Sequence, residues 1–207
     1  MDWGIDDLGG TLSRTDEFEP RPSFTIDWER QYNVGPSDEH LHAIGQFITN
    51  YSMVEWQISG LFAFFLRLPI GEAQRLAVDT NLSMAGKLRY VQGKVEEEGN
   101  ADALTSRDLL ASLKAFDNVS KLRHKIVHWQ WGLNEGDTAT LTDLIKPRNE
   151  KSSNASVSLE ELRQQCHHLM RIFQAIVLNG NVLRGNMTRA QILAARTDTS
   201  PEKLFRP

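Results

Sequence analysis

The chain has 207 residues, a formal net charge of −4, one cysteine, and 40% hydrophobic and 24% charged residues. This length suits one well-packed domain with tails, or at most two small domains. No run of 18 or more apolar residues occurs, which argues against a transmembrane helix. The acidic start "MDWGIDDLGG" lacks the basic and apolar stretches of a secretory signal. With Cys166 alone, no internal disulfide can form, and we expect a cytoplasmic protein without membrane association.

The first segment, residues 1–36, shows neither a helical nor a strand period. It mixes acidic residues, glycine and proline with a few scattered aromatic residues, Trp3, Phe18, Phe24 and Trp28. This composition predicts a poorly ordered or extended N-terminal arm.

A long helix is predicted from Ser37 to near Pro69. Ser37 is an expected N-cap, because Asp38 and Glu39 follow it in the first turn, where the helix dipole favours acids. Seven positions then recur at spacings of three and four, which is typical of a buried helix face. They are Ile44, Ile48, Tyr51, Glu55, Ile58, Phe62 and Phe65. The carboxylate of Glu55 therefore stands where an apolar residue is expected.

Two shorter helices and a second long one should follow. The shorter ones cover "GEAQRLAV" and "SMAGKLRYVQGKVEEEG", the latter capped by Ser83 and stopped at Gly99-Asn100. The long helix should begin near Thr105, where "TSRD" resembles a capping box. Its apolar face combines Leu109, Leu113, Phe116, Val119 and Val127 with the small Ser112 and Ser120. Arg123 falls in the middle of that face, and Lys114, Lys121 and Lys125 lie on the opposite side.

The remaining chain predicts a small hairpin and a closing helix. "WQWGLNEGDTATLTDL" alternates like two short strands with "NEGD" as the turn, and "KPRNEKSSNAS" reads as a loop. Ser158 with Glu161 then forms a capping box for the last long helix. Residues 185–207 form a C-terminal tail, in which one more turn of helix is expected at Thr188 to Ala195. The predicted fold is all-α: an antiparallel helical bundle over residues 37–184 with a β-hairpin insert.

Glu55 and Arg123 are each out of pattern and carry opposite charges. A buried charge without a partner costs several kcal/mol, so we expect the two to meet as a carboxylate–guanidinium fork. A purely structural ion pair that sets the packing register explains the same pattern equally well.

His128 adds a titratable group beside this arginine, at a helix end where solvent reaches it. An arginine can stabilise charge on a phosphoryl centre, and a histidine can move a hydroxyl proton. About 7.5 Å of rise and about 140° of rotation separate the two positions on an ideal helix. One copy therefore holds them apart, while two copies related by a two-fold axis would form a single cleft.

The segment "RHKIVH", Arg123 to His128, resembles the R-polar-x-x-x-H signature of the HEPN superfamily, with His124 in the polar slot. The surroundings are similar as well: "YSMVEW" with its acidic residue in an early helix, "HWQW" after the motif, and "SLEEL" opening the last helix. The resemblance covers roughly residues 37–183. Where the family often has asparagine in the polar slot, this chain has His124, and the role of that residue stays open.

The resemblance implies a HEPN-like helical domain that forms a homodimer and cleaves RNA without metal. Arg123 and His128 would be catalytic, Glu55 would orient the arginine, and His124 would line the cleft. A toxin or phage-defence effector, restrained by an antitoxin or other partner protein, is the matching role. The alternative is a non-catalytic HEPN-like module that dimerises or binds a protein or nucleotide, which the acidic net charge favours. A helical protein with a merely structural Glu55–Arg123 pair is the third possibility.

The remaining candidate residues are expected to contact RNA. Lys114, Lys121 and Lys125 would meet the RNA backbone, and the alternative is that they form only a solvated face. Trp129 or Trp131 would stack on a base if exposed, although capping the helices is the more economical role for both tryptophans. His124 and His128 lie four residues apart and could chelate zinc, but no Glu or Cys completes a known ligand spacing. We therefore expect no metal and no cofactor.

Overall fold

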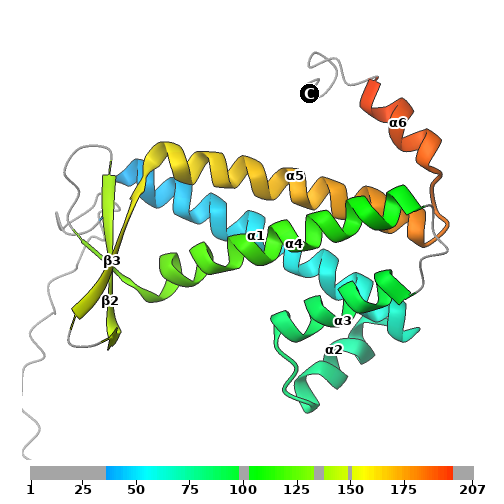
Figure 1. Ribbon diagram of the computed structural model, residues 1–207, viewed down its shortest axis with the longest axis horizontal. Helices are drawn as coiled ribbons and strands as arrows, with labels where there is room; N and C mark the ends of the chain where they lie inside the picture. The colour runs from blue at the N-terminus through cyan, green and yellow to red at the C-terminus, as the bar shows by residue number, and fades with distance from the viewer. Residues whose placement is uncertain (1–35, 98–102, 133–137, 149–150, 198–207) are drawn as a thin grey trace, which may run out of the picture. The chain divides into compact units, whose positions relative to one another are not determined.

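The computed structural model describes residues 36–97, 103–132, 138–148 and 151–197 (Figure 1). The chain divides into two units, Met1–Asn33 and Val34–Pro207. All described residues belong to the second unit, so the predicted arm at residues 1–36 lies, apart from Pro36, outside them.

The described part of the chain is mostly helical and carries one small antiparallel sheet. The helices are α1 (Asp38–Leu66), α2 (Ile70–Asp79), α3 (Met84–Glu97), α4 (Ala103–His128), α5 (Leu159–Leu183) and α6 (Arg189–Thr197). The strands are β1 (Gln130–Trp131), β2 (Thr138–Arg148) and β3 (Lys151–Ser158), in the order β1-β2-β3. The helical class and the extra strands after the motif helix match the prediction.

Three long helices, α1, α4 and α5, pack together and enclose most of the core. The α4 helix runs opposite to both others (Figure 1). In contrast, α1 and α5 run in the same direction, because Asn50 near the start of α1 donates to the Cys166 carbonyl at 3.2 Å, whereas Leu61 further along meets Gly180. The predicted antiparallel arrangement therefore holds for α4 but not for α1 against α5.

The predicted helix starts at Ser37, Ser83 and Ser158 are confirmed. Ser37 and Ser83 accept from the backbone N–H groups of His40 and Gly86. Ser158 and Glu161 form the complete capping box. Such caps satisfy N–H groups that the helix itself leaves unpaired.

Helix α4 begins two residues before the predicted start near Thr105, but the capping role predicted for Asp108 and one of the predicted core positions were wrong. The helix begins at Ala103, so Thr105 lies inside it, and Asp108 binds Arg189 of α6 at 2.8 Å instead of capping its own helix. Val127 is 45% exposed, whereas Ile126 is 4% exposed. Two helical turns bring residue i+7 back to nearly the same face, and Ile126 stands seven residues after buried Val119.

The sheet contains the predicted hairpin and one strand that was missed. Trp131 of β1 pairs with Leu141 of β2 as expected, and the turn "NEGD" lies outside the described residues. The segment predicted as a loop instead forms β3, which pairs with β2 through Leu141 and Ala155. Lys, Ser and Asn disfavour a strand locally, but β2 supplies the backbone partners and Val157 is buried.

The helical turn predicted at Thr188–Ala195 corresponds to α6 (Arg189–Thr197). Helix α6 buries Ile192 to 4% exposure and is tied to α4 through Arg189. Across the described ranges, no helix is both long and apolar enough to cross a membrane.

Candidate functional site

Arg123 lies on α4 where this helix meets α1. Its side chain is half-buried, and its guanidinium carbon lies 5.7 Å from the centre of the Tyr51 ring of α1. A cation at this distance from an aromatic ring is attracted by the ring quadrupole. The arginine is thus held against an aromatic surface at the edge of the core.

Tyr51 is itself held by a short hydrogen-bond chain. Ser120 Oγ donates to the Phe116 carbonyl at 3.1 Å, and it lies 2.8 Å from the Tyr51 hydroxyl. Either hydroxyl of this Tyr51–Ser120 pair can be the donor. Burial raises the pKa of Tyr51, and its hydrogen bond to Ser120 acts in the opposite direction. The ring under Arg123 is therefore a neutral, fixed platform at neutral pH.

Glu55 stands one helical turn after Tyr51 and is half-buried. Burial raises its pKa above the ordinary value, while the charges of Arg123 and Lys87 oppose that shift. Among the described residues no carboxylate lies within 4.0 Å of the Arg123 guanidinium, so the predicted fork with Glu55 is not formed. Glu55 acts on Arg123 through charge at longer range, and the N–H groups of the arginine stay available to an anion.

A hollow of about 430 Å³ opens on α4 at Ser120, the hydrogen-bond partner of Tyr51, and Arg123 is not among the residues that line it. Its lining residues are Asp117, Ser120, Lys121, His124, Lys125 and Trp129. The Lys125 ammonium lies 5.1 Å from the centre of the Trp129 ring, and Lys121 is exposed. The hollow thus combines an aromatic ring with two cations and one carboxylate, a set that can contact a nucleotide base and its phosphate.

Two of the predicted RNA-binding residues lie outside this hollow. Lys114 is exposed on α4 two turns before Lys121 and does not line it. Trp131 is half-buried on β1, and its indole Nε1 donates to the Ile126 carbonyl at 3.0 Å. Trp131 therefore covers the end of α4, which was the more economical of the two predicted roles.

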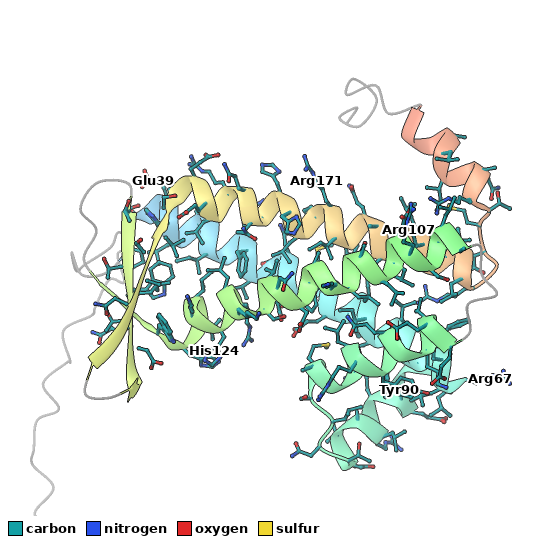
Figure 2. The ribbon with its side chains drawn as sticks, in the orientation of Figure 1. Glu39, Arg67, Tyr90, Arg107, His124 and Arg171 are labelled. Carbon is teal, nitrogen blue, oxygen red and sulfur yellow. The ribbon has the colours of Figure 1, made fainter. Side chains whose placement is uncertain are left out.

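His128 is the last residue of α4 and is exposed. Its ring centre lies 4.8 Å from that of His124, one turn earlier, with 48° between the ring planes. Figure 2 shows His124 projecting from the sheet-proximal end of α4, on the side away from α5 in this view. The two imidazoles are therefore side by side next to the hollow and open to solvent.

Sequence reasoning missed three residues of this site: Tyr51, Ser120 and Asp117. Tyr51 was predicted only as a core residue and Ser120 only as a small residue on the apolar face. Their contact joins positions 69 residues apart, which no local pattern reveals. Asp117 had a weak signal, since it lies one turn before Lys121 on the lysine side of α4.

No protein-family model, no curated protein and no solved structure matches this chain. What the site can do therefore follows from the chemistry of its own residues. Within the described ranges, no group of three or more His, Cys, Asp or Glu side chains could hold a metal ion. A half-buried arginine, two exposed imidazoles and two lysines can bind a phosphate and transfer protons near it.

Proposed function

We propose that this chain is a metal-independent endoribonuclease of the HEPN type that acts as a homodimer. One observation carries the proposal: the Arg123 guanidinium rests half-buried on the Tyr51 ring, with no carboxylate within 4.0 Å in the described part of the chain. An arginine that is partly desolvated but not neutralised by an ion pair is suited to an anionic ligand. The exposed imidazoles of His124 and His128 on the next turns supply the proton-transfer group that RNA cleavage needs.

In the proposed reaction, the 2′-hydroxyl of the substrate attacks the adjacent phosphate. His128 acts as general base or acid in this step, because it is the solvent-exposed member of the RHKIVH motif at the helix end. Arg123 stabilises the negative charge that develops on the phosphorane-like centre. The leaving 5′-oxygen takes up a proton, so the products are a 2′,3′-cyclic phosphate and a 5′-hydroxyl.

The surrounding residues position the substrate. Lys121 and Lys125 contact the RNA backbone, Trp129 presents a ring to a base, and His124 lines the cleft. Lys114 contacts the backbone further along α4. Glu55 interacts electrostatically with Arg123 but does not form a direct ion pair with it.

Homodimerisation follows from the spacing of Arg123 and His128. Five helical residues separate them by about 140° around α4, so one protomer does not aim both at a single phosphate. Two copies of this face, related by a two-fold axis, would place the arginine of one beside the histidine of the other. We assign such an enzyme to the cytoplasm, as a toxin or phage-defence effector that an antitoxin protein restrains.

The test is RNA cleavage by the purified chain in EDTA, with His128→Ala as the matched variant. Wild-type protein should cut single-stranded RNA and leave cyclic-phosphate ends, and His128→Ala should lose at least a hundredfold in rate. Because His128 is exposed, the variant should keep its fold and its oligomeric state, which circular dichroism and sedimentation check. Undiminished cleavage by His128→Ala would remove the histidine from the reaction.

A non-catalytic HEPN-like module is the second candidate, favoured by an exposed apolar surface on α1. Trp56 is 55% exposed and Met53 is 38% exposed, and both line a hollow of about 500 Å³ together with Phe173 of α5. Exposed tryptophan and methionine side chains of this kind are enriched in protein interfaces. In this case the folded protein leaves RNA intact, and Trp56→Ser weakens its self-association in analytical ultracentrifugation.

A further inference from the structure

His124 and His128 form a pair of neighbouring imidazoles, whereas the proposed RNA cleavage assigns proton transfer to His128 alone. They are four residues apart on α4, both are exposed, and their ring centres lie 4.8 Å from each other. Within the described part of the chain, neither imidazole has a hydrogen-bond or ion-pair partner. Both rings therefore have nitrogen lone pairs available to a ligand from solvent.

The spacing of the two rings matches that of imidazoles bound to one metal ion. A metal–nitrogen bond measures about 2.1 Å, and a ring nitrogen lies about 1.1 Å from the ring centre. For a nitrogen–metal–nitrogen angle of roughly 90 to 110°, the two ring centres then stand roughly 4.5 to 5.2 Å apart. The observed 4.8 Å falls inside this interval, so binding needs only rotation about side-chain bonds.

We propose that His124 and His128 bind a divalent transition-metal ion, such as Zn²⁺, Ni²⁺ or Cu²⁺, and that this ion inhibits the nuclease. The inhibition rests on the proposed function: the metal takes the lone pair with which His128 accepts a proton. Imidazole nitrogen prefers these ions to Mg²⁺ or Ca²⁺, which favour oxygen. Water completes the coordination shell, since no third His, Cys, Asp or Glu ligand is present among the described residues.

The surroundings set the strength of this site. Lys121 and Lys125 bring two positive charges to the adjoining hollow, and the single carboxylate of Asp117 offsets only one of them. Like charges weaken cation binding at short range. The ion is therefore a reversible inhibitor that a chelator removes, and Cu²⁺ should bind more tightly than Ni²⁺ or Zn²⁺.

Isothermal titration calorimetry of the full chain with NiCl₂ and ZnCl₂ tests the site independently of RNA. Wild-type protein should bind one ion per chain, and His124→Ala and His128→Ala should each weaken binding at least tenfold. His168→Ala, which removes another exposed histidine on α5, should leave the affinity unchanged. Equal affinity in wild type and His124→Ala would overturn the metal site.

The proposed inhibition by metal is tested by measuring RNA cleavage at buffered concentrations of free Zn²⁺. The rate of each protein is divided by the rate of the same protein in EDTA. Wild-type activity should fall as Zn²⁺ saturates the site and return when EDTA is added, whereas His124→Ala should need at least tenfold more Zn²⁺ for half-inhibition. Zinc binding by calorimetry without loss of activity would refute the inhibition alone. Absence of cleavage in EDTA would refute the nuclease and its inhibition, and calorimetry would still decide the metal site.

Discussion

At the scale of single residues, the site depends on how Arg123 is held. It lies against an aromatic ring at 5.7 Å and interacts with the charge of Glu55 without a direct ion pair. This arrangement differs from a buried ion pair, in which the carboxylate would occupy the N–H groups of the arginine. Charge that is oriented but not neutralised is what an anion-binding centre requires.

The raised pKa of Glu55 predicts how the stability of the folded protein depends on pH. Its pKa is raised in the folded state, chiefly by burial, so the folded protein binds this proton more tightly than the unfolded chain does. The contribution of Glu55 to stability is therefore fully present below its ordinary pKa of 4.5 and is lost as pH rises through the raised value. Glu55→Gln should gain stability relative to wild type as pH increases from about 4 to about 7.

Urea denaturation at several pH values checks this expectation, with Glu96→Gln on α3 as the exposed control. The control should show no such trend relative to wild type. If the difference between wild type and Glu55→Gln were constant with pH, or changed in the opposite direction, burial would not control this carboxyl group.

The Tyr51–Ser120 hydrogen bond makes a second prediction at this scale. Tyr51→Phe keeps the ring beneath Arg123 but removes the hydroxyl that lies 2.8 Å from Ser120 Oγ. A hydrogen bond of this kind contributes about 1 kcal/mol to the free energy of unfolding. A double-mutant cycle of Tyr51→Phe and Ser120→Ala, measured by chemical denaturation, should give a coupling energy of about 1 kcal/mol. Fully additive effects would mean that the two hydroxyls do not interact in solution.

At the scale of secondary-structure elements, a charged contact joins α6 to α4. Arg189 donates to Asp108 at 2.8 Å and to Thr105 at 3.4 Å. The hydrogen bond from Arg189 is the largest of the effects that hold the pKa of Asp108 below its usual value. Ile192 of α6 is also nearly fully buried.

Arg189→Met should therefore loosen α6 while leaving the long helices folded. Amide hydrogen exchange in residues 189–197 should accelerate by about three- to tenfold, the effect of losing one partly exposed charge-assisted hydrogen bond. Arg107→Met is the matched control, because Arg107 reaches the other oxygen of Asp108 from a largely exposed position. If both variants exchanged alike, or if neither differed from wild type, the Arg189 contact would not attach the helix.

Sequence patterns predicted those elements whose signals are local. The caps at Ser37, Ser83 and Ser158 lie within three residues of the groups they satisfy, so they could be read directly from the chain. The strand β3 could not, because its polar residues are stabilised by pairing with β2 and not by their own propensity. The capping role predicted for Asp108 was wrong for a similar reason, since Asp108 bonds to a residue 81 positions away.

The residues of the candidate site were likewise predictable only where their sequence signals are local. Arg123 and His128 could be found because both lie in one short motif, and Glu55 because it interrupts an apolar face. Charge complementarity predicted that Glu55 and Arg123 would influence each other, but not the distance between them. The Tyr51 platform arises from packing α1 against α4, and no pattern within either helix specifies that contact. The hollow is lined by residues of α4 together with Trp129.

At the scale of the whole molecule, the proposed cleavage reaction depends on two components. They are the RHKIVH motif of the protein and the 2′-hydroxyl of the RNA. The three long helices place the RHKIVH motif at the end of α4 near the sheet, with its histidines open to solvent (Figure 2). In the proposal, this end of α4 is where RNA and a second copy of the chain bind.

The measurement that tests this account most directly is end-group analysis of RNA incubated with the chain in EDTA, beside the same RNA carrying 2′-O-methyl groups. The account predicts 2′,3′-cyclic phosphate and 5′-hydroxyl ends from the unmodified RNA, no cutting of the methylated RNA, and loss of cleavage in His128→Ala. Intact RNA in the presence of well-folded dimeric protein, or equal cutting of the methylated RNA, would contradict it.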